Sequence, residues 1–214
     1  MTNITCIATF RAQLVHKPRS TLSGDPRFNG GVRLPDGYEI QVLVNTHASA
    51  LAAAYDRNRE HLAPWDPVRP ASFFTPGGQA ADVVARLDVV RRGLGASWVL
   101  VHDDAIVGRV NLNNIVRGVF QSSSVGYWVD GDHVGRGLAT ALVGYVTEQA
   151  RALELHRLEA GTLVHNLASQ AVLRRSGFEE FGRAAAYLFI AGEWRDHVLF
   201  QRVLHDRPPG NPVD

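Results

Sequence analysis

The chain has almost no cysteine and no long apolar segment. Cys6 is the only cysteine among 214 residues, so an internal disulfide is excluded, and nothing near it in the sequence suggests the lowered pKa of a nucleophilic thiol. No apolar run reaches the roughly 18 residues of a membrane helix, and no charged-then-apolar leader is visible. These absences favour a cytoplasmic protein that does not enter a membrane.

The chain also lacks a dominant charge. Lys and Arg total 22 against 21 Asp and Glu, a formal net charge of +1. So small a net charge gives no general attraction to nucleic acid or to an anionic membrane, and we expect neither as a partner. An anionic ligand must therefore be held locally. The nine histidines form no H-x-x-x-H or Cys/His pattern, so no metal site is predicted.

The length suits one domain that can bury most of its apolar surface without disulfides or structural metal. Residues 1–35 pass from a weakly apolar stretch into a segment rich in Gly, Pro and Asn, and we interpret them as an N-terminal appendage. A mobile arm, an added strand and part of a homodimer contact all remain open for it. Residues 36–204 are the predicted folded domain, and residues 205–214, rich in proline, are a predicted flexible tail.

Apolar periodicity predicts both strands and helices within the domain. The expected strands are Tyr38–Val44, Trp98–Val101, Ile106–Leu112, Ser124–Val129, His156–Leu163, Tyr187–Ile190 and His197–Val203. The expected helices are one capped by Thr46 that runs toward Glu60, one over Gly78–Arg92, one that follows Gly137 and a short one opened by Asn166.

Two glycines mark the point where the strand Ser124–Val129 gives way to a helix, in the run Gly135-Arg136-Gly137-Leu138-Ala139-Thr140. Without Cβ atoms, Gly135 and Gly137 allow a tight turn that brings backbone N–H groups up to an anion, and the positive end of the helix faces the same point. A ligand that carries a diphosphate is the natural guest. The alternative is a glycine turn that only starts a helix.

The glycine run is one of several motifs whose order and spacing resemble the GNAT acetyltransferases, and most closely the RimJ/RimL branch, which acetylates N-terminal amines of ribosomal proteins. The other motifs are Asn58-Arg59-Glu60-His61-Leu62 with Pro64-Trp65, Gly126-Tyr127-Trp128-Val129, Arg157-Leu158-Glu159-Ala160, Asn166-x-x-Ser169 and Ser176-Gly177-Phe178. The resemblance covers residues 36–203. It implies an α/β fold of the α+β kind, with a central mixed, mostly antiparallel sheet flanked by helices.

The resemblance implies acetyl-CoA as the acetyl donor, attacked directly by an amine in a ternary complex. The motifs contain no Cys–His or Ser–His–Asp set, which agrees with a scheme that forms no acyl-enzyme. Backbone N–H groups would hold the pyrophosphate, and they belong to Val134, Gly135, Arg136, Gly137, Leu138 and Ala139. The Arg136 side chain either adds a charged contact or is solvated.

The resemblance also assigns roles near the thioester. The N–H of Val129 would polarise the thioester carbonyl, against the alternative of an ordinary core residue. Asn166 would bind the pantetheine arm, against the alternative of a helix N-cap. Many GNAT enzymes have a tyrosine acid at the position of Leu173, so Ser169, which matches a serine of the RimL-like enzymes, becomes the candidate that protonates the departing thiolate; the alternative is a helix-start serine.

Two carboxylates are candidates on the acceptor side. Glu60 lies in the motif that borders the acceptor site in the RimJ/RimL branch, where it would bind the incoming ammonium or order a water, and Asp196 lies in the last predicted hairpin. A solvated surface position is the alternative for both. Three functions therefore stand: acetylation of a protein N-terminal amine, acetylation of a small-molecule amine such as an antibiotic, and a non-catalytic acyl-CoA-binding regulatory module.

Overall fold

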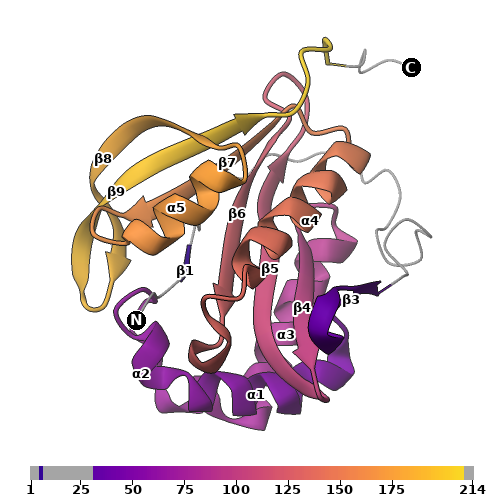
Figure 1. Cartoon of the computed structure of the whole chain (residues 1–214), viewed down its shortest axis with the longest axis vertical. Coiled ribbons are helices and arrows are strands. Elements are labelled where there is room, and N and C mark those ends of the chain that lie inside the picture. The colour runs from indigo at the N-terminus through magenta and orange to yellow at the C-terminus, as the bar shows by residue number, and fades with distance from the viewer. Residues whose placement is uncertain (1–4, 7–30, 210–214) are drawn as a thin grey trace.

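A mixed sheet with helices on both faces organises the chain (Figure 1), and the computed structural model describes residues 5–6 and 31–209. The strands are β1 Thr5–Cys6, β2 Val32–Arg33, β3 Glu39–Val42, β4 Ala96–His102, β5 Ala105–Val116, β6 Ser122–Val129, β7 Arg157–Leu163, β8 Glu179–Ile190 and β9 Glu193–Val203. Their order is β2-β3-β4-β5-β6-β7-β9-β8, and β1 pairs with β6. Only β6 and β7 pair in parallel, so the predicted mixed, mostly antiparallel sheet is confirmed.

The helices α1 Ala48–Arg57 and α3 Pro76–Arg91 cover one face of the sheet, and α4 Leu138–Ala152 and α5 Leu167–Arg175 cover the other (Figure 1). Strand β6 serves both layers because successive side chains point to opposite faces. Tyr127 belongs to the core under α4 and α5, whereas Trp128 belongs to the core under α1 and α3. Within the described residues no helix combines the length and apolar character needed to cross a membrane.

Strands β6 and β7 run together only at their start. Their ladder extends from the pair Ser122 and Arg157 to the pair Ser124 and Glu159, and beyond it the two strands diverge (Figure 1). We call this divergence, between residues 125–129 of β6 and residues 160–163 of β7, the split. In the split, β1 pairs with Tyr127 and Trp128. The split leaves one edge of β6 free of β7 near the point where β6 meets the glycine loop.

The predicted first helix is wrong at both ends. Thr46 is not its cap, because it lies in a short 3-10 turn, Asn45–His47, and α1 begins only at Ala48. The helix does not continue to Glu60 either. It ends before Asn58, whose φ of −101° and ψ of 14° leave the helical range, and a separate turn, α2, spans Arg59–Leu62.

The other elements agree with the sequence more closely. The second helix begins at Pro76 rather than Gly78, because the Thr75 side chain accepts a hydrogen bond from Gly78 N. The last hairpin is longer than predicted. Strand β8 starts at Glu179 rather than Tyr187. Its first part was missed because the irregular register between Ala184 and Leu188 interrupts the alternation of apolar and polar residues.

Part of the predicted N-terminal appendage joins the sheet, through the two residues of β1 and the two of β2. Residues 1–4 and 7–30 of that appendage lie outside the described part of the chain, as do residues 210–214 of the predicted tail. Residues 205–209 form neither helix nor strand. The division of the chain at residues 35 and 204 stays a prediction.

Candidate active site

The glycine loop forms a turn of alternating backbone conformation directly before α4. Gly135 has a φ of 79° and Gly137 a φ of 76°, both in the left-handed region that favours glycine. A Cβ added to either glycine would meet no other atom within 4 Å, so the space in front of the loop is open. A backbone of this kind directs successive N–H groups toward one point and is suited to an anion.

The first turn of α4 supplies further donors to the same point. Gly137 is the N-cap, and because it has no side chain it makes no side-chain capping hydrogen bond. The first intrahelical bond runs from Ala141 N to Gly137 O at 3.0 Å, so the N–H groups of Leu138, Ala139 and Thr140 have no partner inside the helix. These donors and the helix dipole together favour a phosphate group.

A hydrogen-bonded chain anchors the loop to the start of β3. The Arg136 guanidinium donates to the hydroxyl oxygen of Tyr38 at 3.3 Å and to the carbonyl oxygen of Asp132 at 3.4 Å. The Tyr38 hydroxyl is 2.8 Å from Nδ1 of His133, and burial lowers the pKa of His133. A neutral His133 ring can accept a hydrogen bond from the Tyr38 hydroxyl, whose oxygen in turn accepts from Arg136. These contacts tie Arg136 to the protein although its side chain is exposed at the loop.

Val129 is the last residue of β6 and presents its backbone to the split. The N–H of Asp130 donates to Val107 O of β5 at 2.9 Å. Since neighbouring N–H groups of a strand point to opposite edges, the N–H and carbonyl of Val129 point away from β5. His61 Nε2 lies 3.1 Å from the Val129 carbonyl oxygen, which can only accept, so Nε2 carries the proton. Helix α2 thus meets β6 where Val129 faces the split.

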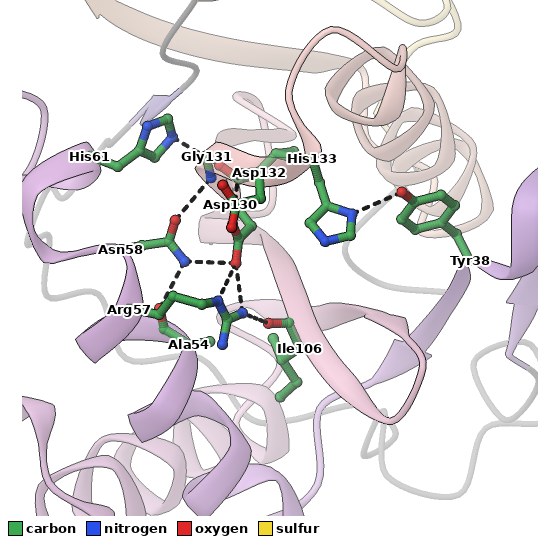
Figure 2. Close-up of polar contacts among 11 residues, drawn as sticks. Tyr38, Ala54, Arg57, Asn58, His61, Ile106, Asp130, Gly131, Asp132 and His133 are labelled. Atoms are coloured by element: carbon green, nitrogen blue, oxygen red, sulfur yellow. Dashed lines mark hydrogen bonds and ion pairs between the residues drawn. The ribbon is translucent and has the colours of Figure 1, made fainter.

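A buried carboxylate, Asp130, joins this end of β6 to the junction of α1 and α2 (Figure 2). Its Oδ2 accepts from Arg57 Nη2 at 2.6 Å and from Asn58 Nδ2 at 2.8 Å, and its Oδ1 accepts from Asp132 N at 3.0 Å. Asn58 Oδ1 accepts from Gly131 N at 2.9 Å. Burial alone would raise the pKa of Asp130, but the hydrogen bonds from Asn58, Asp132 and Arg57 outweigh it and the pKa is lowered.

Polar groups at the start of α5 are held against β6. Asn166 Oδ1 accepts from Ser169 N at 3.0 Å, which is the geometry of a helix N-cap. The Ser169 hydroxyl oxygen lies 2.9 Å from the Tyr127 hydroxyl oxygen, and both side chains are buried. Because α5 follows β7, this contact connects the two sides of the split.

The sequence matches the acetyltransferase (GNAT) domain family over residues 40–179. The chain belongs to the GNAT acetyltransferase family. It is therefore an acetyl-CoA-dependent N-acetyltransferase.

Similar proteins agree with this identification. The chain is 35% identical, over 178 residues, to the ribosomal protein uS5-alanine N-acetyltransferase of Escherichia coli (strain K12), a match that covers 82% of this chain and 92% of that protein. The crystal structure of ribosomal-protein-S5-alanine acetyltransferase from Vibrio fischeri is similar at a TM-score of 0.80 and 32% identity, over 84% of this chain and 100% of that one. The structure of Mycobacterium smegmatis RimJ in complex with CoA-disulfide is similar at a TM-score of 0.75 and 30% identity, over 81% of this chain and 86% of that one.

The GNAT donor fits the glycine loop. Acetyl-CoA carries a diphosphate, and the loop offers an open backbone surface with donors from the loop and from the first turn of α4. Among the described residues no group of three His, Cys, Asp or Glu side chains is arranged to hold a metal ion. The helix-cap alternative for Asn166 is seen directly, and its predicted contact with the pantetheine arm stays a prediction.

The structure separates the predicted acceptor-side carboxylates. Glu60 is exposed on α2 and next in sequence to His61, and its side chain makes no hydrogen bond or ion pair with other described residues. Asp196 Oδ1 accepts from Ala186 N at 2.8 Å and so supports an irregular point of β8, where Ala186 has a φ of 47°. Leu173 is fully buried in the core under α5 and offers no proton.

The sequence reasoning missed three groups that the fold brings to the site. Tyr127 meets Ser169, His61 meets Val129, and Asp130 binds Arg57 and Asn58. Each pair is separated by 42 to 73 residues in the chain, so periodicity carries no sign of it. The motifs Asn58-to-Leu62 and Gly126-to-Val129 contain His61 and Tyr127, but the sequence alone does not predict which residues their side chains contact.

Proposed function

We propose that this N-acetyltransferase modifies the N-terminal amine of a protein, with a peptide N-terminus preferred over a small molecule. One observation carries the proposal: the segment that follows α1 closes over the end of β6. His61 contacts the carbonyl of Val129, and farther along Asp66 O accepts from Ala191 N, in the turn between β8 and β9, at 3.1 Å. This segment therefore contacts both the split side of β6 and the last hairpin, which supports its place beside the acceptor amine.

The relatives support the same choice of acceptor. The Escherichia coli protein, 35% identical, is an alanine N-acetyltransferase for ribosomal protein uS5. An α-amino group has a pKa near 8, so a substantial fraction is unprotonated near neutral pH, whereas a lysine amine near 10.4 is almost fully charged. A site without a strongly buried base on α2 is therefore better matched to a chain terminus. A cytoplasmic location and a homodimer remain predictions from the sequence.

Several residues of the chain have roles in the proposed mechanism. Acetyl-CoA, when bound, supplies an acetyl group activated as a thioester. The backbone N–H groups from Val134 to Ala139 hold its pyrophosphate, and the N–H of Val129 polarises the thioester carbonyl. Glu60 attracts the ammonium form of the acceptor, and Ser169 gives a proton to the departing sulfur.

An acceptor screen tests the proposed function. Peptides with free N-terminal alanine or serine, the same peptides with blocked N-termini, polyamines and aminated antibiotics are each incubated with acetyl-CoA and the full chain, and thiol release is measured. We expect release with free N-termini and a pH profile that rises near pH 8. Activity on a small amine with none on any free N-terminal peptide would overturn the proposal, and a profile that rises only near pH 10 would point to a lysine acceptor.

Replacing Ser169 with alanine is expected to lower kcat about tenfold, less than the roughly 100-fold or more typical of general acid catalysis, because a hydroxyl is a weak acid. The KM for acetyl-CoA should change by less than about twofold, because the lost contact matters only when the thiolate forms. Ser176→Ala is the matched control, since Ser176 is also buried and lies at the other end of α5. Equal kcat values for Ser169→Ala and the unmodified protein would leave Ser169 as a helix-start residue only.

Replacing Glu60 with glutamine is expected to raise the acceptor KM about two- to fivefold, the effect of a solvent-exposed carboxylate on a nearby cation. Acetyl-CoA affinity should stay the same, because the glycine loop lies on another element. Glu148→Gln removes the same charge from the exposed face of α4 and controls for net charge. The increase should shrink at high salt. If the two variants have the same acceptor KM, Glu60 has no part in acceptor binding.

A further inference from the structure

Two buried hydroxyls meet where the sheet opens. Tyr127 is 2% exposed and Ser169 is fully buried, and their hydroxyl oxygens are 2.9 Å apart. Tyr127 belongs to the part of β6 that has separated from β7, and Ser169 belongs to the helix that follows β7. This contact is a side-chain hydrogen bond between the two sides of the split. The same stretch of β6 pairs with β1, with Cys6 opposite Tyr127.

The chemistry of the pair favours Tyr127 as the donor. A phenol, with a pKa near 10, is a far stronger acid than an aliphatic hydroxyl, so it is the better hydrogen-bond donor of the two. The Tyr127 hydroxyl also lies 3.4 Å from the carbonyl oxygen of Ser169, which can only accept. Two oxygens of Ser169 thus lie near this phenol, and one of them can only accept. A proton donated by Tyr127 leaves the proton of Ser169 available to a third group.

The main chain of Ser169 is fixed as well. Its N–H donates to Asn166 Oδ1 at 3.0 Å, so the residue is held from its backbone by Asn166 and from its side chain by Tyr127. A hydroxyl that accepts a hydrogen bond becomes a stronger donor through its own proton, because consecutive hydrogen bonds polarise each other. The same arrangement therefore orients Ser169 and increases its acidity.

We propose that Tyr127 is the positioning residue that makes Ser169 an effective proton donor to the departing thiolate. This inference rests on the proposed function. As the amine nitrogen bonds to the acetyl carbon and the carbon–sulfur bond breaks, the Ser169 proton moves to sulfur and the Tyr127 proton moves toward Ser169 Oγ. Solvent returns a proton to Tyr127, and the product amide loses one to solvent. Tyr127 thus supplies, through Ser169, the phenolic proton that many GNAT enzymes draw from a tyrosine at the position of Leu173.

A double-mutant cycle tests the coupling. Tyr127→Phe keeps the ring in the core and removes only the hydroxyl, and we expect kcat to fall about fivefold with the KM for acetyl-CoA unchanged. When Ser169 is already alanine, adding Tyr127→Phe should change kcat by less than about twofold. Multiplying losses would show that the hydroxyls act separately and would overturn the proposal. Tyr145→Phe is the matched control, a half-buried tyrosine on α4 under the same face of the sheet.

A binding experiment gives a second readout without catalysis. Calorimetry compares CoA with desulfo-CoA, which lacks the sulfur, for the full chain and each variant. We expect the unmodified protein to prefer CoA about fivefold, Ser169→Ala to lose the preference and Tyr127→Phe to lose most of it. A full preference in Tyr127→Phe would overturn the role of Tyr127 even if peptide acetylation is intact. Failure of peptide acetylation itself, with this preference retained, would instead count against the proposed acceptor.

Discussion

Replacing Gly137 with valine is expected to lower the affinity for CoA about 100-fold. The φ of 76° at this position suits glycine, and a β-branched side chain both resists that conformation and projects into the open space before the loop. The change should cost about two hydrogen bonds to a charged group, and at the low end of about 1.5 kcal/mol each this is about 3 kcal/mol, or roughly 100-fold in Kd. Isothermal titration with CoA measures the loss.

The chain contains a matched control for backbone strain. Gly118 also has a positive φ, 71°, and an added Cβ there also meets nothing within 4 Å, but it lies between β5 and β6, away from the loop. Gly118→Val should therefore lose a similar amount of stability and keep its CoA affinity. An unchanged Kd in Gly137→Val would remove the glycine loop from the donor site. Equal weakening in both variants would mean that strain, rather than blocked access, is the cause.

The positions of the glycine loop and of the Asn166 motif in the fold could be predicted from the sequence because their signals are local. Gly135 and Gly137 stand within a few residues of the strand and helix that they connect, and Asn166 and Ser169 lie within one helical turn. The structure places the loop at the start of α4 and the second motif at the start of α5, as expected. The hairpin of β4 and β5 was visible for the same reason: two apolar runs joined by a short polar turn.

The segment proposed for the acceptor side was harder to predict because long-range contacts shape it. Thr46 has the residue type of an N-cap, but a 3-10 turn comes first and α1 starts two residues later. Asn58 interrupts the predicted helix, where its side chain bonds to Ala54 O, Asp130 and Gly131 N. No local sequence pattern predicts that Asn58 bonds to residues more than 70 positions away. The sequence therefore identified the motif around Glu60 but not which of its side chains face the site.

The contacts of Asp130 hold the end of β6 and the junction of α1 and α2 in one geometry. The residue directly follows Val129, whose N–H is assigned to the thioester, and it binds Arg57 and Asn58 at the start of the acceptor segment. Gly131, the next residue, donates to Asn58, and the glycine loop follows within a few positions. One carboxylate thus fixes the end of β6, the junction of α1 and α2 and the approach to the loop. Its loss should disturb donor and acceptor positions together.

Replacing Asp130 with alanine is expected to lower the free energy of unfolding by about 3 kcal/mol. The carboxylate is 1% exposed, and its removal leaves donors of Arg57, Asn58 and Asp132 without their acceptor. Breaking a buried ion pair costs about 3–5 kcal/mol, and the low end applies because the Arg57 side chain is 40% exposed. Urea unfolding measures the change. Asp132→Ala, at an exposed carboxylate two residues away, should lie within about 0.5 kcal/mol of the unmodified protein.

The pH dependence of this loss separates charge from packing. The pKa of Asp130 is lower in the folded protein than the value near 3.9 expected in the unfolded chain, because the hydrogen bonds from Asn58, Asp132 and Arg57 outweigh burial. A lowered carboxyl pKa stabilises the fold above the unfolded value, and that contribution is lost as the pH falls through the folded value. The stability gap between the unmodified protein and Asp130→Asn should therefore be full at pH 7 and close progressively below about pH 4. A gap that stays constant down to pH 3 would show that shape at residue 130, rather than its charge, holds α1 and β6 together.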